Sequence, residues 1–208
     1  RHARGVLAGS EDFDGNYGQF CRADVETETA WFPVQTTHTT NTSSETVSTI
    51  RFPMHPFLGI MDVTTASNQR PSSIPPADYG GNIDLRNLTV ESTLFLPVQI
   101  EGAGLYIGNP HFTQGNGEVS LTALEASLRA TLRVQVVPTA EAKRLFGRTD
   151  LPFAISHGTL IPMGFSSTLD DALSQSVEHA IDMITAMFEM PRQQVYLLLS
   201  AAIDFDAT

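Results

Sequence analysis

The residues best suited to chemistry lie in one short stretch, Gly108 to Ser120, with the sequence G-N-P-H-F-T-Q-G-N-G-E-V-S. This stretch combines His111 and Glu118 with a glutamine, two asparagines and four glycine or proline residues. Glycines let a backbone approach a ligand closely, and loops held between ordered segments often carry binding and catalytic side chains. Apolar residues flank the stretch on both sides. We therefore predict a site-bearing loop here.

Further polar candidates occur at His55 and, after a Gly-Gly turn, at Asn82 and Asp84. Taken singly, each has an ordinary structural explanation, such as a histidine bonded to a carbonyl or an Asn or Asp in a turn. His111 and Glu118 could likewise face water in a tight hairpin. Together, two histidines and two acids on three separate loops favour a metal site, because Zn²⁺ takes histidine nitrogen and carboxylate oxygen.

Such a set suggests hydrolysis, because a bound metal polarises a carbonyl and a remaining carboxylate can act as general base toward a leaving amine. The pattern is not a fixed-spacing metal motif such as H-E-x-x-H. The sequence also lacks a G-x-S-x-G elbow, a phosphate-binding loop and a dinucleotide fingerprint. Residue types alone thus leave the metal and the reaction open.

The composition limits the class of protein. The 208 residues are 41% hydrophobic and 17% charged, which suits one folded domain or two small ones. A net charge of −11, with only 12 Lys and Arg, argues against binding to nucleic acid or anionic membranes. A single cysteine, Cys21, excludes an internal disulfide, and no apolar run is long enough to cross a membrane. We expect a cytoplasmic protein.

Short strand-like segments separated by turns must position these side chains. They are residues 25–36, 50–63 with a break at His55-Pro56, 93–100, 104–107 and 128–137. This spacing is typical of a β-sandwich or barrel. The Thr-, Ser- and Asn-rich residues 36–49 predict an exposed hairpin, because threonine favours strands.

The C-terminal part predicts helices. A capping box at Ser167–Asp170 precedes apolar residues at helical spacing from Leu169 to Phe188, and Pro191 can open a second helix. The expected fold is α+β and mostly β, with a sandwich- or barrel-like body and a helical C-terminal segment. We divide it into a β entry segment (1–50) that continues a sheet begun elsewhere, a β-rich core with the site loops (51–140), and an α/β cover (141–208).

Four blocks of this sequence resemble the acetamidase/formamidase family. They are His55–Met61 (like H-P-F-x-G-x-x), Gly80–Asp84 (G-G-N-x-D) leading into Ser92–Val98 (G-S-x-L-x-L-P-V), Gly108–Glu118 (G-D-x-H-x-x-Q-G-D-G-E) and Val195–Asp204 (the final helix and strand). Their order and spacing also fit, over nearly the whole chain.

The resemblance implies a β-rich enzyme that hydrolyses a small amide to a carboxylate and ammonia, with a metal in some members. Carried over by position, the site comprises His55, Asn82, Asp84, His111, Gln114 and Glu118. We expect His55, Asp84 and His111 to hold a divalent metal, most simply Zn²⁺. We expect Glu118 to be the base, with His111, Asn82 and Gln114 acting beside it on the substrate.

The sequence departs from the family pattern in three respects. Asn109 and Asn116 replace two motif aspartates, which removes negative charge and would weaken the hold on a divalent cation. Asp62 stands where a small residue is usual. Family members also have further N-terminal strands, so we expect a second chain to supply them within an oligomer. Two alternatives stay open: acid/base chemistry of another class, such as that of a cyclase, lyase or isomerase, and a non-catalytic subunit.

Overall fold

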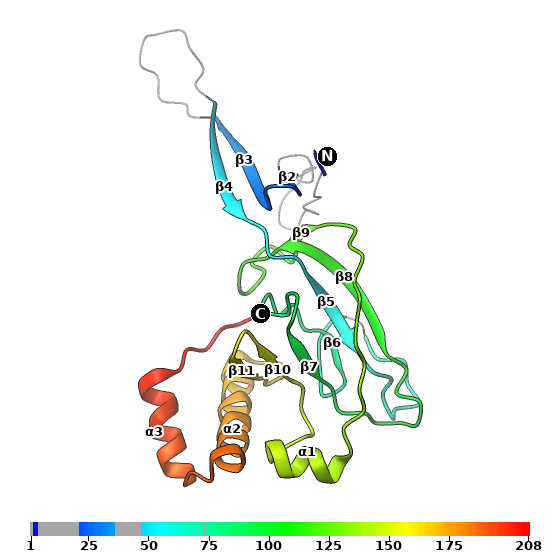
Figure 1. Cartoon of the computed structure of the whole chain (residues 1–208), viewed down its shortest axis with the longest axis vertical. Coiled ribbons are helices and arrows are strands. Elements are labelled where there is room, and N and C mark those ends of the chain that lie inside the picture. The colour runs from blue at the N-terminus through cyan, green and yellow to red at the C-terminus, as the bar shows by residue number, and fades with distance from the viewer. Residues whose placement is uncertain (1, 4–20, 36–46, 73) are drawn as a thin grey trace.

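The computed structural model describes residues 2–3, 21–35, 47–72 and 74–208 (Figure 1). These residues form three antiparallel sheets and three helices, two of which lie near the C-terminus. The prediction of a mostly β fold with a helical C-terminal segment is confirmed. None of the sheets formed by these residues closes on itself, so the predicted barrel-like closure does not occur there. The sandwich arrangement stays a prediction.

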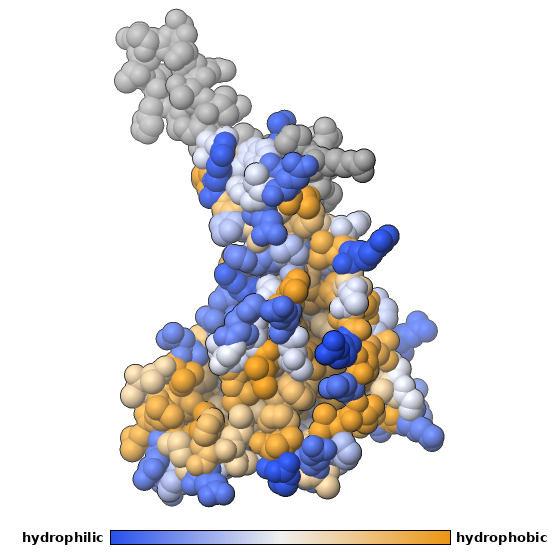
Figure 2. Space-filling view, viewed as in Figure 1, coloured by the Kyte–Doolittle hydropathy of each residue, from blue (hydrophilic) through white to orange (hydrophobic). Residues whose placement is uncertain are grey.

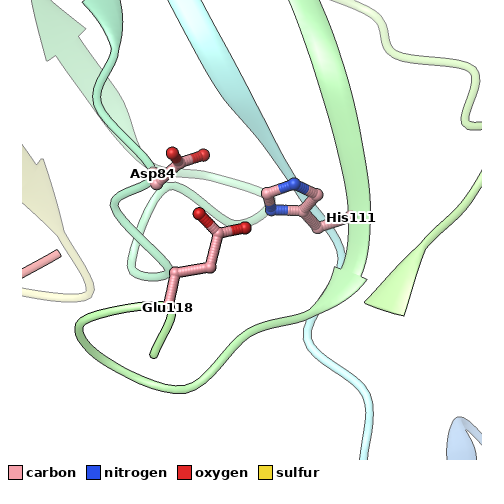
Figure 3. A group of neighbouring side chains, drawn as sticks. All are labelled: Asp84, His111 and Glu118. Carbon is pink, nitrogen blue, oxygen red and sulfur yellow. The ribbon is translucent and has the colours of Figure 1, made fainter. Parts of the chain in front are cut away.

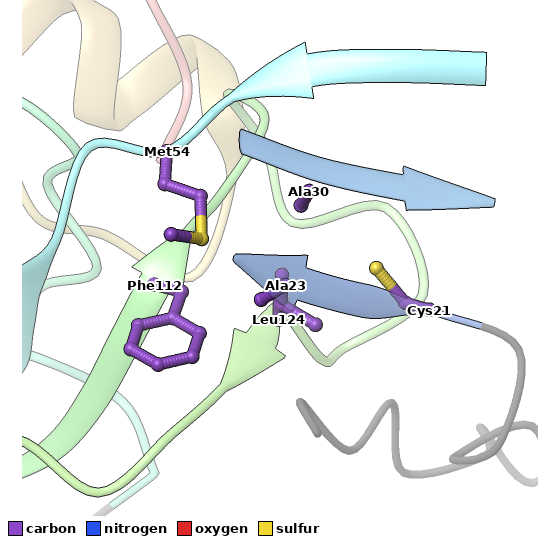
Figure 4. Packing of buried hydrophobic residues seen from close by; sticks show 6 residues of the cluster. All are labelled: Cys21, Ala23, Ala30, Met54, Phe112 and Leu124. Carbon is purple, nitrogen blue, oxygen red and sulfur yellow. The ribbon is translucent and has the colours of Figure 1, made fainter. Parts of the chain in front are cut away.

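The first sheet has four strands in chain order, β1 (His2–Ala3), β2 (Arg22–Asp24), β3 (Thr29–Gln35) and β4 (Val47–Pro53). Strand β3 confirms the strand expected in residues 25–36. The predicted hairpin at 36–49 falls mostly on residues 36–46, outside the described residues. A compact apolar cluster joins this sheet to the next one (Figure 4): Cys21, Ala23, Ala30, Met54, Phe112 and Leu124.

The second sheet carries the candidate site. Its strand order is β6 (Gly80–Asn82), β5 (Phe57–Asp62), β8 (Tyr106–Thr113) and β9 (Leu124–Glu125), all antiparallel. The expected break at His55-Pro56 separates β4 from β5. Residues 108–113 are part of β8, not a loop as predicted, because their backbone pairs with β5 from Leu58↔Pro110 to Ile60↔Gly108. Pairing with a neighbouring strand thus overrides the local glycine and proline signals.

The third sheet has the order β11 (Thr159–Pro162), β10 (Phe153–Ser156) and β7 (Thr93–Phe95). The hairpin β10–β11 turns through His157 and Gly158, with φ of 48° and 82°. Positive φ at both turn residues is the type I′ geometry that suits a two-residue hairpin. This hairpin was not predicted, and β7 is shorter than predicted, because only three residues of the expected strand 93–100 pair.

The helices are α1 (Thr139–Phe146), α2 (Leu169–Phe188) and α3 (Arg192–Ala202). Helix α2 is capped by Thr168, whose hydroxyl accepts a hydrogen bond from Asp171 N at 3.2 Å, one residue after the predicted capping box. Helix α3 follows Pro191, as predicted. None of the described helices is both long enough and apolar enough to span a membrane.

One predicted strand, residues 128–137, is unpaired. Its residues belong to no sheet, and within the described part of the chain the backbone–backbone hydrogen bonds stop at Ala126 N and resume at Ala142 N. Residues 129–137 are exposed. The prediction of a paired strand is therefore wrong for this chain by itself, although the alternating apolar pattern of a strand is present.

Candidate active site

Three side chains that are distant in sequence converge at one place (Figure 3). Asp84 follows β6, His111 lies on β8, and Glu118 lies in the loop after β8. One ligand atom of each lies within 4.8 Å of the others. Asp84 is 6% exposed and His111 is 0% exposed, while Glu118 is half-buried. The motif prediction therefore names a real cluster in the fold.

Pairing, ring packing and hydrogen bonds within the second sheet hold this cluster in place. His111 pairs with Phe57 across β5 and β8, and the Phe57 ring packs edge-on against the imidazole with centroids 4.9 Å apart. The amide N–H groups of Ile83 and Asp84 both donate to the Gly59 carbonyl, at 3.0 and 3.1 Å. Gln114 Nε2 donates to the Asp84 carbonyl at 2.8 Å. The Asp84 turn is thus tied to β5 through Gly59 and to Gln114, which comes directly after β8.

Backbone conformation in the left-handed region also marks this site. Asp84, Asn109 and Glu118 have φ of 50°, 50° and 36°. Positive φ is uncommon for residues other than glycine, although Asn and Asp tolerate it, and such strain concentrates at functional sites. Hydrogen bonds hold two of these backbones: the Asp84 N–H donates to the Gly59 carbonyl at 3.1 Å, and the Glu118 N–H donates to the Gly115 carbonyl at 3.2 Å.

Gly59 leaves the space that the cluster occupies. A Cβ atom at this position would collide with Asp84 Oδ1 and Asn109 Oδ1 and would crowd His111 Cε1. We expect Gly59→Ala to displace Asp84 and lower both activity and stability, by about 1–3 kcal/mol for the free energy of unfolding, as is usual for overpacking. Thermal unfolding and turnover of this variant would check the expectation. Unchanged activity would mean that the cluster geometry is not required.

Two side chains that were not predicted as site residues, Asn109 and Glu125, lie beside His111. Asn109 lies two residues before His111 and therefore on the same face of β8. Its Nδ2 donates to Glu125 Oε2 at 3.3 Å, and the same oxygen lies 3.2 Å from His111 Nε2. Strand β9 places Glu125 opposite His111, beside a register shift between His111 and Thr113. Because residues two apart share a face of a strand, the spacing of Asn109 and His111 could have indicated Asn109. No local signal in the sequence predicts the register that places Glu125 opposite His111.

Burial and crowded carboxylates shift the proton affinities of the site. Burial, together with the charges of Asp84 and Glu125, raises the pKa of Glu118 to about 7. The pKa of Asp84 is also raised, mainly by burial, although His111 and an Asn82 hydrogen bond oppose the shift. Burial alone would lower the pKa of His111, but Glu125 and the other acids more than offset it, so the pKa is raised.

These shifts predict how the stability of the metal-free protein depends on pH. Unfolded Glu118 releases its proton near pH 4.5, whereas folded Glu118 keeps it to about pH 7. The folded state binds more protons between these values, so its stability falls as the pH rises through them. With solvent screening we expect a loss of about 1 kcal/mol, or about 2–4 °C in Tm. Calorimetry at pH 5 and pH 7.5 would check it, and Glu118→Gln should flatten the slope.

The other predicted site residues take different positions. The Asn82 side chain bonds the Asp84 carboxylate, and Gln114, 6% exposed, holds the Asp84 backbone. His55 is exposed just before β5 and is not brought into the three-residue cluster. Asp62 lies at the end of β5 remote from Phe57, about 10 Å along the strand from Gly59. The departure at Asp62 therefore lies away from the cluster.

The residues of the cluster fit a divalent metal. Asp84 Oδ1 and both ring nitrogens of His111 are buried and have no hydrogen-bond partner. Unpaired buried polar atoms are costly unless something binds them. Imidazole nitrogen with carboxylate oxygen is a donor set that suits Zn²⁺, whose tetrahedral bonds of about 2.1 Å set the ligand atoms about 3.4 Å apart. Small side-chain movements would bring the cluster to that spacing.

Comparisons with known proteins show similarity to formamidases and acetamidases. Over 48 residues the chain is 46% identical to a formamidase of Methylophilus methylotrophus, a stretch that is 23% of this chain and 12% of that protein. Over 54 residues it is 44% identical to an acetamidase of Mycolicibacterium smegmatis, covering 26% of this chain and 13% of that protein. The crystal structure of an acetamidase from Bacillus halodurans matches 74% of this chain with 25% identity and a TM-score of 0.65.

The aligned part is about half of that solved structure, 49% of its length. The sequence pattern of the Acetamidase/Formamidase family matches residues 62–205, which include Asp84, His111 and Glu118 and three of the four blocks that carry the resemblance. That range is well over half of the chain. The chain therefore belongs to the acetamidase/formamidase family.

Proposed function

We propose that this chain takes part in the hydrolysis of a small, non-peptide amide to a carboxylate and ammonia. The observation that carries the proposal is the buried cluster of Asp84, His111 and Glu118 in a member of this family. The names of its relatives, a formamidase and acetamidases, suggest the size of the amide. The partly buried cluster also offers the low-water surroundings in which electrostatic catalysis is strongest.

In this proposal Asp84 and His111 hold a divalent metal, most simply Zn²⁺. Such an ion supplies Lewis acidity toward the amide carbonyl oxygen. The half-buried carboxylate of Glu118 takes a proton from the attacking water, which is the role of a general base. As the C–N bond breaks, Glu118 passes the proton to the leaving nitrogen, so that ammonia departs and the new C–O bond remains.

The remaining polar residues act through Asp84. Asn82 bonds its carboxylate and Gln114 holds its backbone, so both keep the Asp84 oxygen aimed at His111. His55 stays a proposed third ligand. Its side chain is exposed in this structure, so it would have to turn toward the cluster to bind the metal. A His55→Ala variant with unchanged metal affinity would remove it from the ligand set.

Ammonia release from formamide, acetamide, propionamide and a lactam tests the function directly. The complete purified assembly is assayed with and without added Zn²⁺. Release that Zn²⁺ enhances, and that a chelator removes, supports metal-assisted hydrolysis. Binding of Zn²⁺ without release from any amide would favour another acid/base chemistry at the same site. Neither binding nor release, by a protein shown to be folded, would favour a non-catalytic subunit.

We also propose that a second chain pairs with residues 128–137. This segment is exposed from residue 129 onward and has no backbone partners in the described part of the chain, and an open strand is a template for β-pairing. Apolar side chains also gather on the helical end of the molecule (Figure 2), where Tyr196 and Leu197 of α3 are exposed. Hydrogen exchange tests the pairing: amides 128–137 should exchange quickly in the isolated chain and slowly in the assembly.

A further inference from the structure

Glu125 has no role in the proposed reaction, yet it is in direct contact with the buried histidine. It comes from β9, the edge strand of the site sheet, which sets it opposite His111. Its Oε2 lies 3.2 Å from His111 Nε2, off the direction of a regular hydrogen bond. With Nε2 beside Glu125, Nδ1 is the ring nitrogen that faces Asp84 and Glu118 (Figure 3).

Two donors hold the Glu125 carboxylate in this position. Asn109 Nδ2 donates to Oε2 at 3.3 Å, and the Ala123 amide N–H donates to Oε1 at 3.4 Å. The side chain of Glu125 is 30% exposed, so it is restrained and still partly solvated. An amide at position 109 offers a proton to Glu125, whereas the aspartate of the family motif would offer only a second negative charge.

We propose that Glu125, anchored by Asn109, is a positioning residue that fixes the His111 ring with Nδ1 toward the metal site. The inference rests on the proposed metal-assisted function. A carboxylate beside the outer nitrogen of a ligand histidine fixes the tautomer and the ring orientation and increases the basicity of the inner nitrogen. Loss of such a partner typically weakens metal affinity by about 10- to 100-fold.

The test is Glu125→Gln, which keeps the size of the side chain and removes its charge. Zn²⁺ affinity of the metal-free protein is measured by competition with a chromophoric chelator, and the visible spectrum is recorded with Co²⁺. We expect Zn²⁺ affinity to fall by about 10- to 100-fold, the Co²⁺ spectrum to change, and kcat to fall more than KM rises. Glu101→Gln, at an exposed turn, is the matched control and should change nothing.

Asn109→Gly is the second variant, because glycine accepts the positive φ of this position and the change removes the side-chain amide that anchors Glu125. It should weaken Zn²⁺ binding in the same direction but less than Glu125→Gln. Wild-type affinity and an unchanged Co²⁺ spectrum in both variants would overturn the role of Glu125 alone. A wild-type protein that binds neither ion would overturn this inference together with the metal-assisted function.

Discussion

Glu118→Gln is expected to lower kcat for amide hydrolysis by about 10²- to 10⁴-fold, the range that a general base contributes. Glutamine keeps the shape of the side chain and an acceptor oxygen but cannot take a proton. Steady-state ammonia release at saturating amide, with bound Zn²⁺ quantified in the same sample, measures the loss.

Metal content separates two roles for Glu118. Its carboxylate lies close enough to Asp84 and His111 to serve as a third ligand instead of a base. As a base, Glu118→Gln should leave Zn²⁺ affinity within about tenfold of wild type while turnover collapses, whereas loss of a ligand would weaken affinity first. A variant that keeps full turnover would remove Glu118 from the mechanism altogether.

His111→Asn is expected to abolish metal binding and activity together. The imidazole is fully buried, both its nitrogens lack hydrogen-bond partners, and it stands among Asp84, Glu118 and Glu125. Without it the cluster keeps only the two carboxylates of Asp84 and Glu118 and has no nitrogen ligand. We expect Zn²⁺ affinity to fall by more than about 100-fold, because a lost ligand should cost more than a lost partner of a ligand. Equilibrium dialysis and ammonia release would measure both effects.

His157→Asn is the matched control for this variant. His157 occupies the type I′ turn between β10 and β11 with positive φ, where asparagine before glycine is well suited. The control should keep both metal binding and turnover. If His111→Asn also kept its Zn²⁺ and its activity, the cluster would not be the catalytic site.

The sequence by itself determined the elements that depend on nearby residues. Helix α2 follows from apolar residues at helical spacing, helix α3 follows from Pro191, and the break before β5 follows from His55-Pro56. These signals act within a few residues, through capping hydroxyls and the missing amide hydrogen of proline. The type I′ hairpin at His157-Gly158 carried a local signal of the same kind, which the analysis of the sequence overlooked.

The local sequence determined only part of the strand pairing. Residues 128–137 have the alternation of a strand but no partner in the described part of the chain. Residues 108–113 have the composition of a loop but pair with β5. A strand is completed by hydrogen bonds to another segment, so its existence depends on what lies beside it and not on its own composition.

The motifs of the sequence named the three residues of the buried cluster, and only the tertiary structure decided how these residues meet. Asp84, His111 and Glu118 were all predicted, and the pairing of β5 with β8 brings two of them together around Gly59. Glu125 was not predicted, because the register shift beside His111 sets its place on β9. Registers and bulges arise from contacts between strands, and no single stretch of sequence encodes them.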